Sequence, residues 1–534
     1  MYTAIYRTKK GSKTYSYLKL VEGKRVGTTI QKTIIHNFGR VDDKAAAFIT
    51  NLVLKIKTET KENILNQIQS LDAKLYALPT AIYTICQKDL MLDHILSSAF
   101  AETKITSDVV LFSILMIIHR IIDPDSKLAL TRWYKHIALP VELPSEIDVS
   151  SFYYTLDYLM DKKEEIEKRL YVRLLEKGLI EATIVFYDLT SSYFEGVTVP
   201  MSKKGYSRDH RPECKQITLG LVIDKKNRLP LYHEVFEGNR KDCKTVEGVL
   251  EKLKSMFLIT NVIFVADKGM LTPDTLKLLS EHHYQSILSE SVRNAFSQRQ
   301  RRELFARKDT FEKLKDEEGE DILWYTTASH KNGTEVILCY SPQTAYKAKQ
   351  TRDVKLKKMV AFIRDKKEEH AGDADDQELT RMVFAKLVEK KIRKYFVTKK
   401  NKKKKTPTEL FTLKKDVVTR EEYMDGMWIV KSSTKQLSTK ELITTYKDLK
   451  MIEAAFRTLK NVIELRPIGH HKDERVKGHV FICILAFLAG RLLEMKTGKT
   501  LKMIREDYTS AVMLPWQERP LIIGGKDLLA KVKA

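Results

Sequence analysis

The pattern of hydrophobic and polar positions changes character several times along the chain. Residues 1–42 alternate in short stretches such as "TYSYLKLVEG", broken by Gly-Lys turns, which predicts a basic β-stranded segment. From 43 to 180 the apolar positions recur every three or four residues, which predicts helices. One of them, "DKKEEIEKRLYVRLLEKGLI", has Gly178 near its end, where a glycine commonly terminates a helix.

Residues 181–290 show the pattern of a sheet with intervening helices. The apolar run "ATIVFYD" predicts a strand that is buried on both faces and ends at Asp188. The run "NVIFVAD" predicts a second such strand, which ends at Asp267. Two alternating strands joined by a short linker lie between them and predict a hairpin. The order of strands and helices predicts a mixed α/β sheet.

The pattern changes again in residues 291–430. A basic helix is followed by several apolar stretches, and "KMVAFIRD" at 358–365 is interpreted as one of the strands. An acidic-to-basic helix and the basic run "TKKNKKKKT" follow these strands. Residues 431–500 return to a helical pattern, and 501–534 form a C-terminal tail.

A helix is predicted to begin at Ser438, which can form a capping box with Glu441. If the helix continues to residue 460, one narrow stripe carries four polar side chains: Tyr446, Glu453, Arg457 and Lys460. The opposite side is apolar and would pack on the rest of the fold. Considered alone, such a stripe is also typical of an ordinary exposed helix with charges one or two turns apart.

The charge of the chain indicates a polyanionic partner. Lys and Arg number 94 against 70 acidic residues, a net charge of +24, and a balance this basic most often accompanies nucleic acid binding. The five cysteines are scattered with no CxxC pair, which argues against a disulfide framework or a zinc site. The longest apolar run, 480–490, is shorter than the roughly 20 residues that a membrane span needs, so no membrane association is expected.

Three carboxylates combine into a candidate chemistry. Asp188 and Asp267 are expected at the ends of adjacent strands, and Glu453 on the late helix. Carboxylates without basic partners repel one another, and Mg²⁺, which prefers oxygen ligands, relieves that repulsion. Two such ions about 3.5–4 Å apart activate a water or a 3′-hydroxyl and stabilise the leaving oxygen of a phosphodiester. The pattern therefore favours metal-dependent chemistry on DNA.

The chain resembles the DDE transposases of bacterial insertion sequences, in the class marked by a Tyr-x2-Arg-x3-Glu-x6-Lys signature. The stretch "YKDLKMIEAAFRTLK" has the Tyr, Glu and Lys of the signature at these spacings. Leu449 stands where the class has arginine. The resemblance implies that Arg457, one helical turn beyond the glutamate, would substitute for that arginine in part. "YDLTSSYFEG" and "FVADKGM" resemble the family's blocks around its two aspartates.

This resemblance implies a ribonuclease-H-like catalytic fold interrupted by a β-stranded insertion. It implies Asp188, Asp267 and Glu453 as a catalytic triad that holds two Mg²⁺ ions, for which Mn²⁺ is able to substitute. The implied activity is that of a transposase, which binds terminal inverted repeats, cleaves donor DNA and joins the 3′ ends to target DNA. Double-stranded DNA is then the partner, with a homodimer in the synaptic complex and a prokaryotic cytoplasmic location. Tyr446 and Lys460 would contact phosphates of the transposon end.

Further DNA contacts are expected from the resemblance, although each of these residues equally suits a structural or surface role. The insertion of related enzymes can supply a tryptophan that stacks on a flipped base, and Trp324 is the candidate here, with Trp428 in reserve. His210 and Arg211 are candidates for lining the DNA channel near Asp188. A cluster of histidines is interpreted as structural or phosphate-facing, because Mg²⁺ prefers oxygen: His470, His471 and His479.

Two alternatives stay open from the sequence. A ribonuclease-H-like nuclease would cut DNA without strand transfer, and only the long insertion and the Tyr-Glu-Lys helix argue against it. A non-catalytic DNA-binding relative of a transposase is the other alternative. The intact set of Asp188, Asp267 and Glu453 argues against that second reading.

Overall fold

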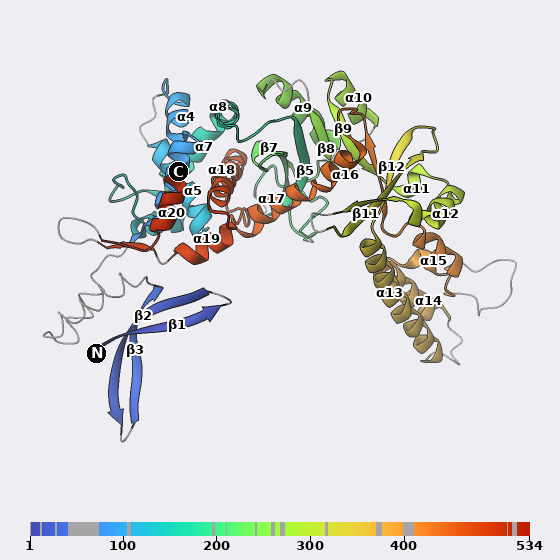
Figure 1. Ribbon diagram of the computed structural model, residues 1–534, viewed down its shortest axis with the longest axis horizontal. Helices are drawn as coiled ribbons and strands as arrows, with labels where there is room; N and C mark the ends of the chain where they lie inside the picture. Colours follow the sequence, from blue (N-terminus) through green and yellow to red (C-terminus); the bar gives the residue numbers. More distant parts are fainter. Residues whose placement is uncertain are drawn as a thin grey trace. The chain divides into compact units, whose positions relative to one another are not determined.

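The computed structural model divides into two compact units, and their elements are shown in Figure 1. The first unit combines Met1–Val262 with Lys450–Ala534, and the second is the continuous segment Ile263–Leu449. The structure describes residues 2–10, 13–26, 29–40, 74–103, 108–194, 198–209, 211–240, 243–257, 262–266, 273–315, 319–369, 376–398, 411–509, 511–514 and 521–533.

The chain begins with a three-stranded antiparallel sheet, in the order β1-β2-β3. Its strands are β1 (Tyr2–Lys10), β2 (Lys13–Val26) and β3 (Thr29–Arg40). The β-structure predicted for this segment is confirmed within the described residues. Lys24 and Lys32, two of its basic residues, are exposed.

A helical region follows, as the sequence predicts. Its α-helices are α3 (Ala77–Thr84), α4 (Leu92–Ala99), α5 (Val109–Ile122), α6 (Lys127–Trp133), α7 (Val149–Asp161) and α8 (Lys163–Glu176). Asp108 caps α5 by accepting a hydrogen bond from the backbone N–H of Leu111 at 2.9 Å. Gly178 follows α8 with a φ of +62°, a left-handed conformation that suits glycine, so its predicted role is confirmed.

Helix α18 (Asp473–Thr497) is the central helix of the first unit. It packs against α5, α7 and β7 (Pro230–Glu237). Within the described part of the chain it is the one helix long and apolar enough to cross a membrane by length and composition alone, and 89% of its most apolar window is buried inside the structure. Such burial is typical of a core helix.

In the first unit, the strand that carries Asp188, β5, pairs with β6, and β6 pairs with β7, all antiparallel. The pairing of β6 (Gln216–Asp224) with β7 confirms the predicted hairpin. The prediction that the first strand ends at Asp188 is wrong, because β5 spans Ile184–Tyr193 and Asp188 lies near its middle. The small polar residues beyond it remain paired with β6 and buried, and the Ser191 hydroxyl accepts the backbone N–H of Arg208 at 2.9 Å.

The second unit has its own strands in the order β10-β11-β12-β13-β9-β8. They are β8 (Ile263–Ala266), β9 (Gln285–Glu290), β10 (Glu312–Lys315), β11 (Asp321–Ser329), β12 (Glu335–Tyr340) and β13 (Met427–Ser432). β8 and β9 are parallel, with α10 (Pro273–Glu281) between them in sequence, and the other neighbouring strands of this unit pair antiparallel. The predicted mixed α/β class is therefore confirmed.

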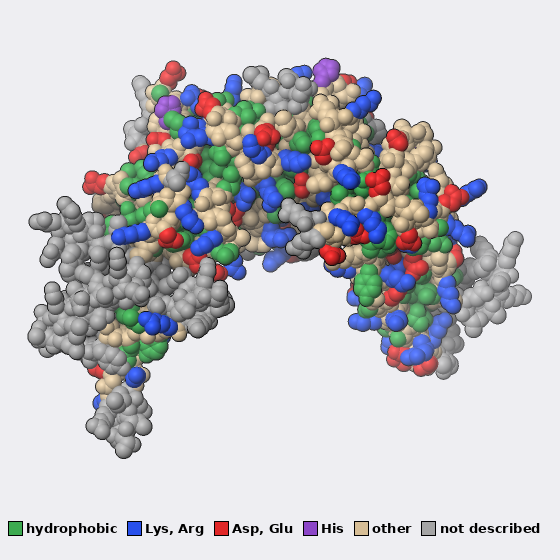
Figure 2. Space-filling model, in the orientation of Figure 1, with side chains coloured by type: hydrophobic (Ala, Val, Ile, Leu, Met, Phe, Trp, Pro, Cys, Tyr) green, Lys and Arg blue, Asp and Glu red, His purple; other side chains and the backbone are tan. Residues whose placement is uncertain are grey.

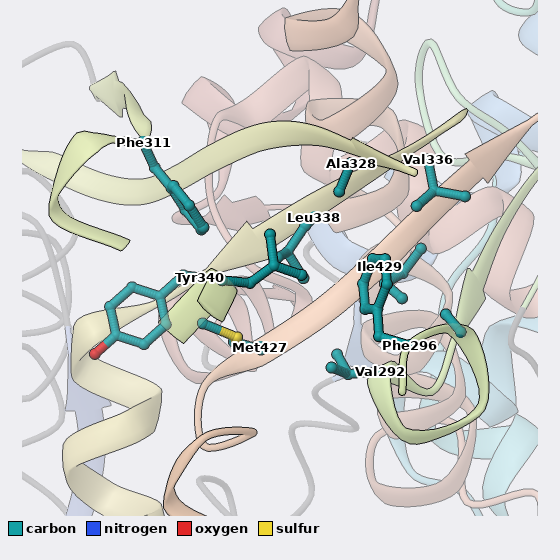
Figure 3. Close-up of a cluster of buried hydrophobic side chains, with 11 residues drawn as sticks. Val292, Phe296, Phe311, Ala328, Val336, Leu338, Tyr340, Met427 and Ile429 are labelled. Atoms are coloured by element: carbon teal, nitrogen blue, oxygen red, sulfur yellow. The ribbon is translucent and has the colours of Figure 1, made fainter. Parts of the chain in front are cut away.

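A cluster of buried side chains holds this second unit together (Figure 3). Leu338 and Tyr340 come from β12, and Met427 and Ile429 come from β13. Val292 and Phe296, at the beginning of the predicted insertion, belong to the same cluster, which therefore joins the beginning of the insertion to its end.

The prediction that the insertion is rich in β-structure is wrong for its central part. The stretch "KMVAFIRD" lies inside the 28-residue helix α13 (Pro342–Glu369), which packs against α14 (Asp376–Glu389). The buried residues of α13 are Arg352, Leu356, Met359 and Ile363. Their spacing of three or four residues is that of a helix with one buried face, although the adjacent apolar residues resemble a strand.

We expect Gly238→Ala to destabilise the first unit by about 1–3 kcal/mol, because the position is overpacked. A Cβ at Gly238 would lie 2.0 Å from the carbonyl oxygen of Gln216 and 2.5 Å from that of Lys203, and neither backbone can yield easily. Urea denaturation followed by circular dichroism measures the change.

The matched control is Gly248→Ala in α9 (Cys243–Phe257). A Cβ there meets nothing within 4 Å, so the same substitution should stabilise the protein by about 0.5–1 kcal/mol. Equal effects of the two substitutions would contradict the close approach at Gly238.

Candidate active site

Asp188 lies on β5 and is half-buried. Its Oδ1 accepts a hydrogen bond from the backbone N–H of Leu189 at 2.7 Å, which orients the carboxylate. Side chains alternate along a strand, so Asp188 and Tyr187 point to opposite faces. The Tyr187 hydroxyl donates to the hydroxyl of Thr245 on α9 at 2.9 Å. Asp188 therefore faces away from α9.

Glu453 lies in the first turn of α17 (Lys450–Asn461), which packs against β5. The buried residues of α17 form the predicted apolar face: Ile452, Ala455, Phe456 and Leu459. Glu453 is exposed, and no ion pair joins it to any described residue. A carboxylate in this first turn is favoured by the unpaired backbone N–H groups of the helix end. The structure thus puts Asp188 and Glu453 on elements in direct contact.

The second predicted aspartate directly follows a described strand. β8 ends at Ala266, and Asp267 lies outside the described residues, as does His210. No three His, Cys, Asp or Glu side chains in the described ranges are grouped so that they could hold a metal ion. The predicted site therefore has two described carboxylates, and its third member stays a prediction.

The predicted capping box is confirmed, but the prediction of one continuous helix from Ser438 to residue 460 is wrong. The Ser438 hydroxyl accepts the Glu441 N–H, and the Glu441 carboxylate accepts the Ser438 N–H at 2.7 Å. Helix α16 spans Thr439–Lys447 and ends there. Just beyond it, the backbone N–H of Leu449 donates to the carbonyl oxygen of Tyr446, three residues back, at 3.1 Å, which is a tighter turn than that of an α-helix. Tyr446 therefore belongs to α16, and the other members of the predicted stripe belong to α17.

Lys460 is largely buried in an ion cluster. Its Nζ lies 2.7 Å from Oδ1 of Asp209, and the guanidinium of Arg466 pairs with the same oxygen. The side chains of Asp209 and Lys460 are only 6% and 11% exposed. Burial lowers the pKa of Lys460, and its hydrogen bond to Asp209 opposes that shift. This lysine is therefore held in place by an acidic partner that the sequence did not reveal.

Arg211 and Trp324 have aromatic or cationic neighbours of their own. Arg211 is exposed, and its guanidinium lies 5.0 Å from the centre of the Tyr193 ring. The ammonium of Lys313 lies 5.3 Å from the centre of the Trp324 ring, and the Tyr340 ring packs at 5.4 Å. A base that stacks on Trp324 from the side of Lys313 would have to displace that lysine.

Comparison with known families decides the class of the protein. The family described as "Transposase DDE domain" matches residues 181–489, more than half of the 534-residue chain. The "IS1634 family transposase, N-terminal domain" matches residues 4–68. The chain belongs to the DDE transposase family. It is an insertion-sequence DNA transposase, as the resemblance in its sequence implies.

Two solved structures are among those similar to this transposase. A piggyBac transposase synaptic complex with hairpin DNA is 8% identical over 81% of this chain and 79% of that chain, with a TM-score of 0.36. A pre-cleavage Mos1 transpososome is 13% identical over 35% of this chain and 60% of that chain, with a TM-score of 0.14. No curated protein matches the transposase.

Sequence reasoning missed Asp209 and Arg466. Both lie in stretches that resemble blocks around the transposase core, "GYSRDHRPECKQ" and "ELRPIGHH". Their ion pair joins positions far apart in the chain, so no local spacing points to it. Membership of those blocks is the one signal that could have singled them out.

We expect Asp209→Ala to destabilise the transposase by about 3 kcal/mol, because it leaves two largely buried cations without their anion. Lys460→Ala should cost less, because Arg466 still neutralises Asp209. Glu181→Ala, which removes the acid of the exposed pair with Lys226, should change little. Urea denaturation of the three variants gives the order, and an equal loss in all three would contradict a buried cluster.

Proposed function

We propose that this transposase cleaves DNA at the ends of its insertion sequence and joins the 3′ ends to target DNA, in a ribonuclease-H-like catalytic fold. The observation that carries the proposal is the contact between β5 and α17, which bear Asp188 and Glu453. The strand and helix order of the core, three antiparallel strands followed by a helix and a parallel strand pair, supports this fold class.

The donor set suits two Mg²⁺ ions, with Mn²⁺ able to substitute. The carboxylate of Glu453 is exposed and lacks a basic partner among the described residues, so a hard cation can be its counter-charge. Asp188 and Asp267 would supply the remaining protein oxygens, with Asp188 oriented by the Leu189 N–H. Bound ions of this kind activate the attacking oxygen and stabilise the leaving oxygen of a phosphodiester.

The DNA contacts belong to the same proposal. Lys460 and Arg457 extend along α17 beyond Glu453 and would follow the DNA backbone. Tyr446, Arg211, His210 and Trp324 are further proposed contacts. The DNA would be the inverted-repeat ends, paired by a homodimer in the prokaryotic cytoplasm. A ribonuclease-H-like nuclease or a non-catalytic DNA-binding protein would differ from this proposal in the assays below.

Replacing any one of the proposed metal ligands should abolish cleavage but preserve DNA binding. The variants are Asp188→Ala, Asp267→Ala and Glu453→Ala. Affinity comes mainly from Lys and Arg neutralising phosphates, whereas the carboxylates hold metal, so end binding should stay within about threefold. The measurement is cleavage and joining of labelled end DNA beside a gel-shift titration. Unaffected cleavage in one variant would remove that residue from the site.

Cleavage should require Mg²⁺ or Mn²⁺. Ca²⁺ should support assembly with poor turnover, because its looser geometry misplaces the reacting oxygens. Single-turnover cleavage in each ion, with EDTA as the control, tests this. Full activity in EDTA would contradict the metal mechanism, and cleavage without joined products would favour the nuclease.

Lys460→Ala should weaken end binding and lower its salt slope by about one unit, if Lys460 contacts a phosphate. In this variant Asp209 still forms its ion pair with Arg466, so the local fold should be preserved. Lys460→Arg retains the charge and is the matched control. Salt titration of end binding distinguishes the outcomes: a wild-type slope with lost cleavage would make Lys460 a chemical residue instead of a positioning one.

A further inference from the structure

The first unit contains a pocket of about 390 Å³ that the catalytic proposal does not use. Its walls come from the end of α5 and the start of α6, from α7 and α18, from residues just after β5, and from the segment between α17 and α18. The basic side chains that line it are Arg120, Lys127, Arg466, His470, His471 and His479. We call it the Lys127 pocket.

Two cations of this pocket are buried without a carboxylate partner. Lys127 is 4% exposed and Arg120 is 5% exposed. Across the described residues, no ion pair or hydrogen bond involves the ammonium of Lys127. Arg120 donates to the carbonyl oxygens of Glu464 at 3.1 Å and Asp125 at 2.5 Å, and its buried Nε has no hydrogen-bond partner. Buried charges without a counter-charge are costly, so an anion at this place would be stabilising.

The local sequence explains how a lysine comes to be buried here. Ser126 caps α6 by accepting the backbone N–H of Ala129 at 3.0 Å, which begins the helix at Lys127. Leu130, one turn further along, is buried on the same side. The two acidic residues that line the pocket, Asp125 and Glu464, are themselves exposed.

Burial and neighbouring positive charge also lower the pKa values of the basic groups in the pocket. Burial, and then the charge of Arg120, lowers the pKa of Lys127 to about 7. Burial, with Lys127 and Arg120 nearby, lowers the pKa of His470 to about 3. The pKa of His479 is also well below its ordinary value. At neutral pH these histidines are uncharged, and their ring N–H groups can act as hydrogen-bond donors.

We infer that the Lys127 pocket binds a phosphate group of the DNA substrate. Arginine offers a planar fork to phosphate oxygens, and lysine adds a point charge. The pocket is larger than a phosphate needs, and Tyr153 and Pro467 line it with apolar surface, which suits the sugar or base attached to that phosphate. A Cβ at Gly469, which also lines the pocket, would meet nothing within 4 Å, so the wall is open there.

Ion pairs connect the pocket to the helix that carries Glu453. Arg466 lines the pocket and also pairs with Asp209, the partner of Lys460 on α17. The pocket would therefore hold the DNA strand at a second point beyond α17. The inference that the phosphate belongs to DNA rests on the proposed function. The binding of an anion in the pocket does not, and it can be measured separately.

The first measurement uses inorganic phosphate as the probe. Wild-type protein in phosphate-free buffer with EDTA should gain about 2 °C or more in Tm on addition of phosphate, relative to chloride at equal ionic strength. Lys127→Met removes the charge and keeps the length, so it should fold at least as stably without phosphate and lose the gain. Lys135→Met, an exposed lysine just after α6, is the matched control and should keep it. A wild type whose Tm does not respond would overturn the anion site.

The second measurement uses end DNA in EDTA, where no cleavage occurs. Lys127→Met should weaken binding about tenfold and lower the salt slope by about one unit, whereas Lys135→Met should not lower affinity by more than about twofold. A lost phosphate response with unchanged DNA binding would overturn the DNA assignment and leave a free-phosphate site. Wild-type protein that responds to phosphate but fails to bind or cleave end DNA would instead contradict the proposed function.

Discussion

The burial of most of α18 is the constraint on which the first unit depends. This helix is apolar around most of its circumference, so neighbours must cover it on every side. The helical region supplies α5 and α7, and the strands supply β7. At Gly478 the contact with α7 is so close that a Cβ would lie 2.8 Å from the carbonyl oxygen of Leu156. One helix therefore joins the helical region, the strands beside Asp188, and the segment that leads back to Glu453.

Features decided by a few neighbouring residues could be predicted from the sequence. The capping box at Ser438, the helix end at Gly178 and the hairpin of β6 and β7 depend on local chemistry, and each is confirmed. Features decided by distant partners could not. β5 continues past Asp188 because β6 offers it a full-length partner. The apolar stretch at 358–365 is helical because only one residue in three or four meets α14.

In the candidate site, too, features set by neighbouring residues were predictable and those set by distant partners were not. The sequence predicted Asp188 on a strand and Glu453 on a late helix with one apolar face, and the structure has them on β5 and α17. Their catalytic role stays a prediction. The partners of the cations were not predictable. Lys460 looks like a solvent-facing lysine in its helix, and only the fold shows Asp209 beside it. Lys127 looks like an ordinary residue at a helix start, and only the fold shows its burial. On the face that Figure 2 shows, acidic side chains lie among the basic ones of the described residues.

The discontinuous first unit has a consequence for the timing of synthesis. The second unit, Ile263–Leu449, is complete before α17 and α18 leave the ribosome. Domains fold as units in the order in which they are made, so the second unit can fold while the first still lacks its central helix. A chain interrupted before residue 450 lacks both Glu453 and the helix that organises the core around Asp188. The first unit can therefore complete its core only after the whole second unit has been synthesised.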